Sequence, residues 1–271
     1  MRGLSTALLV LCAGAPAIAG AADRATASTA APRQADGPER TVQVTPYLWA
    51  AAVDGRISPF RRAPTIGIGK SFAEVMDGLE FGGFVHVWSR RGRAVFSGDV
   101  MYVSTREGHT SGPLPPLLVP VPPGTVVEGR VDSRQANATL QAGYRIVGRE
   151  DFTLDVLAGL RAWRLSNDVT VSAAGLSRSY GEHFDWVDPV VGLRAFRRLG
   201  GNWSLQAQLD AGGAGIGSDA TWSALATANY VVGEHFSLSA GYKVLDVDYD
   251  DGGHVYDARL KGPAFGLTYR F

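Results

Sequence analysis

Charged side chains recur at alternate positions in segments of this chain that are otherwise apolar. Carboxylates and guanidinium groups that face one another can form ion pairs or hold polar solutes, and a histidine beside them can exchange protons. A charge that is removed from bulk water must be paired or hydrated. The candidates are His86, Asp99, Arg145, Asp155, Arg161, Asp188, Arg194 and Asp210.

The segments that carry these charges alternate in polarity. Between residues 135 and 146 the even positions are apolar, as in Ala138 and Leu140, and the odd positions are polar, as in Asn137 and Gln141. Such a period of two is typical of a strand with one apolar face and one polar face. The chain also ends in this pattern, with Phe265, Leu267, Tyr269 and Phe271 on one face.

Ten segments have this character, and turn signals separate them. They are residues 41–53, 79–90, 93–105, 131–147, 152–166, 183–198, 203–213, 219–232, 236–248 and 256–271. Four connections are tight, and those at 54–78, 106–130 and 167–182 are long. The pattern predicts an all-β fold, a transmembrane antiparallel up-and-down β-barrel of about ten strands, with eight or twelve as alternatives. Tight turns would face the periplasm and long loops the outside.

The first residues predict export. Residues 1–22 have the basic start, short apolar stretch and small-residue cleavage site of a signal peptide, and the small, polar residues 23–40 predict a disordered periplasmic leader. The barrel would then occupy residues 41–271. Cys12 is the only cysteine, which excludes a disulfide framework. With 26 basic and 26 acidic residues, no basic excess favours nucleic acid.

Several stretches carry a resemblance to a known group. Asp188–Arg194, Gly241–Tyr249 and Gly262–Phe271, together with Thr45–Trp49, resemble uncharacterised outer-membrane β-barrel proteins of Gram-negative bacteria. That group is similar in design to small barrels of the outer membrane protein A and W type. The resemblance implies an outer-membrane location and an apolar face turned toward lipid and lipopolysaccharide. It also implies insertion by the barrel-assembly machinery. The alternative is a soluble periplasmic barrel or sandwich, whose strands alternate in the same way.

A terminal strand that ends on phenylalanine resembles the assembly signal of such barrels. Phe265, Leu267, Tyr269 and Phe271 are the residues that would carry this signal. Aromatic residues near other strand ends are typical of interfacial girdles. They are Tyr47, Trp49, Tyr102, Tyr144, Trp203, Tyr230, Phe236, Tyr242 and Tyr269.

The interior decides the function. A narrow barrel favours charges that pair across it and plug it, whereas a wider one leaves them lining water. We therefore expect a structural, non-enzymatic barrel or a narrow channel for small solutes. One alternative is an enzyme that acts on lipid or peptide at the outer rim and recruits His86, His183 and Asp185. The other is a module that binds through its loops. The sequence has no Gly-x-Ser-x-Gly and no metal-spaced histidine pair, so we predict no catalytic residue, cofactor or metal. The oligomeric state stays open.

Two connections have a character of their own. Ser71 and Glu74 form a capping-box pattern that predicts either a short helix over the barrel mouth or a surface turn. Residues 112–124 are apolar and rich in proline, so they should be extended and stiff. They would contact lipopolysaccharide or a partner, or form a loop without a binding role.

Overall fold

A computed structural model describes residues 40–58, 60, 61, 64–111, 127–173 and 176–271. The predicted signal peptide, nearly all of the predicted leader, and residues 112–124 lie outside these ranges. The elements are β1 (Arg40–Trp49), β2 (Ala52–Ile57), β3 (Ile66–Lys70), α1 (Phe72–Asp77), β4 (Leu79–Arg91), β5 (Ala94–Ser111), β6 (Val127–Gly148), β7 (Phe152–Ala173), β8 (Leu176–Gly200), β9 (Trp203–Gly213), β10 (Ala220–Val232), β11 (Phe236–Asp251) and β12 (His254–Arg270).

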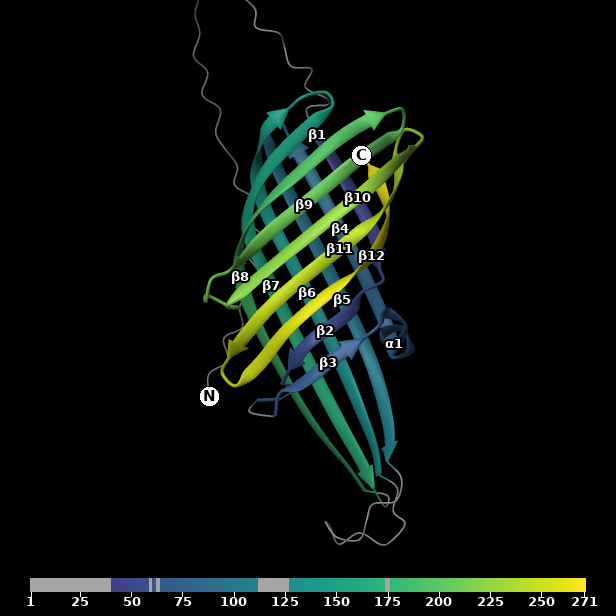
Figure 1. Ribbon diagram of the computed structural model, residues 1–271, viewed down its shortest axis with the longest axis vertical. Helices are drawn as coiled ribbons and strands as arrows, with labels where there is room; N and C mark the ends of the chain where they lie inside the picture. The colour runs from purple at the N-terminus through teal and green to yellow at the C-terminus, as the bar shows by residue number, and fades with distance from the viewer. Residues whose placement is uncertain (1–39, 59, 62–63, 112–126, 174–175) are drawn as a thin grey trace, which may run out of the picture. The chain divides into compact units, whose positions relative to one another are not determined.

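Ten antiparallel strands close into a barrel (Figure 1). β1 pairs with β4 on one side and with β12 on the other, and β4 to β12 pair in sequence order. This confirms the predicted fold class and strand number. Two further strands, β2 and β3, lie outside the ring, where β2 pairs with the first part of β12. No helix in the described ranges has the length and apolarity needed to cross a membrane.

The barrel has a turn end and a loop end. The turn end holds the tight connections between β4 and β5, β6 and β7, β8 and β9, and β10 and β11. Three of these turns contain glycines in the left-handed region, Gly92 at φ 57°, Gly201 at φ 56° and Gly233 at φ 77°, where a side chain would be strained. Short turns face the periplasm in outer-membrane barrels, so we assign the turn end to that side.

The loop end is the opposite end, where β9 connects to β10 and β11 to β12. On one side of the barrel, β5 to β8 extend far beyond these connections (Figure 1). β7 has 22 residues and β8 has 25, whereas a tilted strand needs roughly 9–11 residues to cross a bilayer. The prediction of a loop over residues 167–182 is therefore wrong, because residues 167–173 continue β7 and residues 176–182 belong to β8. Part of the predicted loop 106–130 likewise belongs to β5 and β6. Polar residues suggested loops here because the ends of these strands meet water, and residues 176–181, for example, are all exposed.

The predicted loop at residues 54–78 contains the β2–β3 hairpin and α1, which lie toward the end of the barrel away from the C-terminus (Figure 1). The short helix forms as the capping box predicts. The Ser71 side chain accepts a hydrogen bond from the backbone of Glu74, and the Glu74 carboxylate accepts one from the backbone of Ser71. β3 pairs with β2, so α1 crosses from the hairpin to the start of β4.

A belt of exposed apolar side chains surrounds the ring of strands near the turn end. Leu140 is 52% exposed, Leu160 55%, Val191 65% and Leu209 56%. On β12, Phe265 and Leu267 also point outward, and Phe271 follows them at 71% exposed. Exposed apolar surface on this scale requires an apolar solvent, so this belt lies in lipid.

Candidate functional site

The polarity of the two barrel faces reverses along the strands. On β11 the outward side chains change from apolar Tyr242 to acidic Asp248, while the inward ones change from Lys243 to buried Leu245 and Val247. On β12 the outward residues near the loop end are also charged, with Lys261 paired to Asp54 and Arg259 to Asp246. The barrel wall therefore leaves the lipid at this level and continues in water, where its apolar face turns inward.

One ion-pair network closes the middle of the barrel. Arg161 donates from Nη2 to Asp210 at 2.5 Å, from Nη1 to Thr221 at 2.8 Å and from Nε to Thr139 at 3.0 Å. Asp210 also accepts from Ser223 at 2.6 Å. The Arg161 and Asp210 side chains are each 3% exposed, so the pair is buried and its hydrogen-bonding groups are largely satisfied.

A second network crosses the lumen. Lys243 on β11 donates to Asp99 on β5 at 2.8 Å, and Tyr47 on β1 donates to the same carboxylate at 3.0 Å. His86 lies beside this group, with Nε2 3.1 Å from the Ser97 hydroxyl. Because β5 and β11 stand on different sides of the ring, this contact joins two walls of the barrel.

The remaining charges lie on either side of these networks. Toward the turn end, Asp155 accepts from Arg145 at 2.7 Å, and an Arg194 nitrogen lies 3.6 Å from it. Toward the loop end, Asp188 is fully buried and accepts from Trp186 Nε1 at 3.1 Å and from the backbone and hydroxyl of Ser218. All eight charged residues singled out from the sequence therefore lie inside the barrel. Seven of them, with Lys243, make up what we call the plug: Asp99, Arg145, Asp155, Arg161, Asp188, Arg194 and Asp210.

The plug separates two cavities. The spaces within it have volumes of only about 30 and 60 Å³, enough for a few water molecules. A cavity of about 560 Å³ lies at the turn end and one of about 440 Å³ toward the loop end. The four cations of the plug match its four carboxylates in number. The interior is thus closed by a neutral, hydrogen-bonded section rather than lined by free charges.

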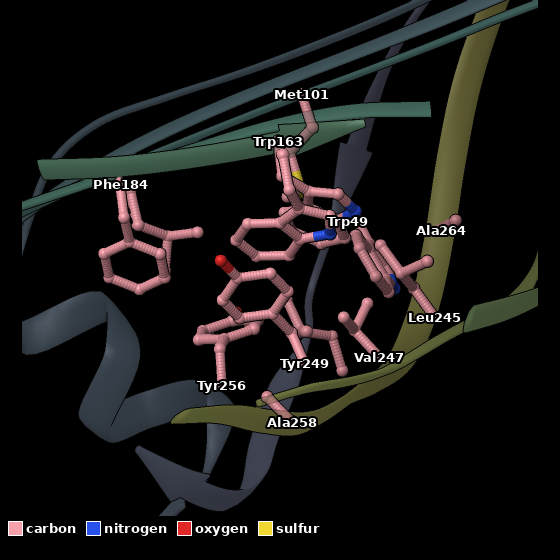
Figure 2. Packing of buried hydrophobic residues seen from close by; sticks show 13 residues of the cluster. Trp49, Met101, Trp163, Phe184, Leu245, Val247, Tyr249, Tyr256, Ala258 and Ala264 are labelled. Atoms are coloured by element: carbon pink, nitrogen blue, oxygen red, sulfur yellow. The ribbon is translucent and has the colours of Figure 1, made fainter. Parts of the chain in front are cut away.

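The loop-side cavity, which we call the chamber, lies in apolar surroundings. Figure 2 shows Trp49, Trp163, Tyr249 and Tyr256 pointing toward one another inside the barrel. The rings of Trp163 and Trp186 stack at 5.5 Å, and those of Trp186 and Tyr249 at 4.1 Å. The chamber adjoins this cluster, and Trp49, Phe84, Met101, Val103, Leu165, Phe184, Tyr256 and Leu260 line it.

The β2–β3 hairpin and α1 form one wall of the chamber. Ile66, Ile68, Phe72 and Met76 line it from this side, and the two α1 residues remain 41% and 47% exposed. Lys70 on β3 forms an ion pair with Glu107 on β5. β3 forms no backbone hydrogen-bond ladder with β4. This wall therefore contacts the long strands β4 and β5 through side chains and through α1.

Two predicted girdle residues do not face the lipid. Trp49 is 5% exposed and lies in the interior cluster, and the Tyr47 hydroxyl reaches the plug. The outward position between them belongs to Leu48, which is 69% exposed. Trp203 and Tyr230 do face outward near the turn end, with ring centroids 5.0 Å apart. The chamber was missed from the sequence, and its available signal was large apolar residues on the inward positions, such as Phe184 and Trp186.

The residues considered for catalysis do not meet. His86 lies within the mid-barrel, whereas His183 and Asp185 are exposed on the outer face of β8. Another pair occurs at the loop end, where His254 Nε2 lies 3.2 Å from Glu182. The pKa of Glu182 is lowered chiefly by the backbone N–H of Arg61, and His254 contributes to this shift. In the described ranges, no three histidine, cysteine or acidic residues gather in a way that could hold a metal ion.

The fold compares with solved outer-membrane barrels, whereas no family model and no curated protein sequence matches the chain. The outer membrane protease OmpT from Escherichia coli is 11% identical, with 86% of this chain and 96% of that chain covered and a TM-score of 0.53. The translocator domain of the autotransporter NalP from Neisseria meningitidis is 13% identical, with 86% and 88% covered and a TM-score of 0.40.

The closed ring, the apolar belt and this likeness in fold define the class of protein. The chain is an integral β-barrel protein of the outer membrane.

Proposed function

We propose that this barrel binds a small apolar molecule in its chamber and does not catalyse a reaction on it. The observation that carries the proposal is a cavity of about 440 Å³ whose lining is dominated by aliphatic and aromatic side chains. Ligand pockets have this character, with a few polar groups that orient the ligand. Here the polar groups include Gln135, which donates to the Tyr256 hydroxyl at 2.8 Å.

The plug supports binding over free flow. Solute that left the chamber toward the periplasm would have to displace buried ion pairs such as Arg161–Asp210. The protein in its resting state then acts as a receptor or as a narrow, gated passage, and it does not conduct like an open porin. A purely structural role would leave the chamber without a ligand.

The test is saturable binding of N-phenyl-1-naphthylamine, whose fluorescence rises in apolar surroundings, to the barrel in phosphatidylcholine nanodiscs. Partition into lipid rises linearly with concentration, so a saturable component at one probe per barrel reports the chamber. Val103→Phe fills space in the chamber and should weaken binding at least about fivefold, or roughly 1 kcal/mol. Val100→Phe is the matched control, because Val100 lies on the same strand but faces outward at 48% exposed.

Two outcomes contradict the proposal. One is a signal that stays linear with probe concentration and equals that of empty nanodiscs. The other is equal weakening by Val103→Phe and Val100→Phe, which would place the probe on the outer surface.

A second candidate is hydrolysis at the outer rim. The proximity of His254 to Glu182 favours it, because an imidazole beside a carboxylate can act as a base. Outer-membrane protease OmpT shares the fold. Cleavage of fluorescein-labelled casein that is lost in His254→Gln but retained in His183→Gln would support this function over binding alone.

A further inference from the structure

The turn-side cavity, which we call the vestibule, is strongly basic. Among the described residues that line its space of about 560 Å³, seven are arginines and one, Glu150, is acidic. At its inner end Arg145 and Arg194 share a single carboxylate, Asp155. Among the described residues that line this cavity, arginines therefore far outnumber carboxylates, which makes its wall basic.

The inner arginines are held in place by the protein. Arg194 donates to Gln206 at 2.8 Å and its guanidinium lies 4.6 Å from the centre of the Trp88 ring. Arg145 approaches the same ring at 5.6 Å. Trp88 is 5% exposed, so this arrangement is fixed before any ligand arrives. Such preorganisation lowers the entropy cost of binding.

Two buried donors in this cavity lack an acceptor. Within the part of the chain that the structure describes, the Nε–H groups of Arg194 and Arg270 have no hydrogen-bond partner. A buried donor without a partner costs free energy unless water or a ligand accepts from it. Both arginines line the vestibule, so each has hydrogen-bonding capacity left over beside the cavity.

From these observations we propose that the vestibule is a binding site for a phosphate-bearing anion. Guanidinium groups match the oxygen geometry of phosphate and bind it through paired hydrogen bonds. Arg149 and Arg198 are exposed at the rim, whereas Arg194 lies deeper and is 4% exposed, so the site runs from the mouth to the plug. The phosphate belongs to a soluble ion or to a phospholipid headgroup of the inner leaflet, because the turn end faces the periplasm.

The experiment measures inorganic pyrophosphate binding by calorimetry to the full mature barrel in phosphatidylcholine nanodiscs. One pyrophosphate should bind per barrel, and the double variant Arg149→Gln/Arg198→Gln should bind roughly tenfold more weakly. Both side chains are exposed, so the variants should keep the folded, heat-modifiable barrel. Arg178→Gln is the matched control, since Arg178 is an exposed arginine on the same strand as Arg198 at the other end of β8.

A second arm distinguishes the two sources of phosphate. This arm uses nanodiscs that contain phosphatidylglycerol. A lipid headgroup would be identified if the wild type no longer binds pyrophosphate in them and retains phosphatidylglycerol, whereas the double variant does not retain this lipid. Unchanged pyrophosphate binding would identify a soluble ion. The proposal is overturned if the wild type neither binds pyrophosphate saturably nor retains phosphatidylglycerol. It is also overturned if Arg178→Gln weakens binding as much as the double variant.

Discussion

Removing Asp210 should destabilise the barrel more than removing any surface carboxylate. Asp210 and Arg161 are each 3% exposed, and Arg161 would keep only the neutral acceptors Thr139 and Thr221. Breaking a buried pair by removing one partner costs about 3–5 kcal/mol, because the remaining charge stays buried. We therefore expect Asp210→Ala to lower the free energy of unfolding by about that amount.

Equilibrium unfolding by urea in lipid vesicles, followed by tryptophan fluorescence, measures the effect. Asp168→Ala is the control, because Asp168 lies 3.4 Å from Arg134 in an exposed pair whose contribution should be about 0–1 kcal/mol. The double variant Arg161→Met/Asp210→Leu should recover much of the loss, since replacing both charges leaves none unpaired. A loss for Asp210→Ala that equals the control would refute the reasoning and would mean that water reaches Arg161.

Three shorter predictions concern assembly, topology and pH. Deleting Phe271 should lower the yield of heat-modifiable barrel in outer-membrane fractions, because it removes an exposed ring from the closing end. A tag at Gly201 should be labelled only after the outer membrane is opened, and a tag within residues 115–123 should be labelled in intact cells. The pKa of Glu182 is depressed, so its contact with Arg61 is fully present at neutral pH and is lost in acid, as the pH falls through the lowered pKa. At pH 7, Glu182→Gln should therefore be cleaved near Arg61 faster than the wild type, and the wild type should approach the rate of the variant as the pH is lowered.

The strand number and the face of each charge could be predicted because alternation is a local property of the sequence. Asp155, Arg161 and Asp210 had to face away from Leu160 and Leu209, and the structure places them so. Which charges pair could not be predicted, since pairing depends on the diameter and stagger of the whole barrel. Lys243 reaches Asp99 on another wall of the barrel for this reason.

The chamber was missed because one rule was applied along the whole of each strand. The rule that apolar residues face outward holds only where lipid is the solvent. On β11, Asp246 and Asp248 follow Tyr242 and Val244 on the same face, and this change marks where the strand enters water. A strand of 16 residues is also longer than a bilayer requires. A strand that is longer than the bilayer requires, and whose outward face changes from apolar to charged, therefore predicts an extension beyond the lipid with an apolar interior.

The order of the layers along the barrel bears on what it can do. A lumen that conducts freely needs continuous water, yet the section between the two cavities leaves spaces of only about 30 and 60 Å³. Its neutral charge balance gives a passing ion no net attraction, and displacing Arg161 or Lys243 would leave Asp210 or Asp99 unpaired. The chamber and the vestibule favour opposite kinds of ligand, one apolar and one anionic. These features favour two separate binding sites on either side of a closed section over a single path for one solute.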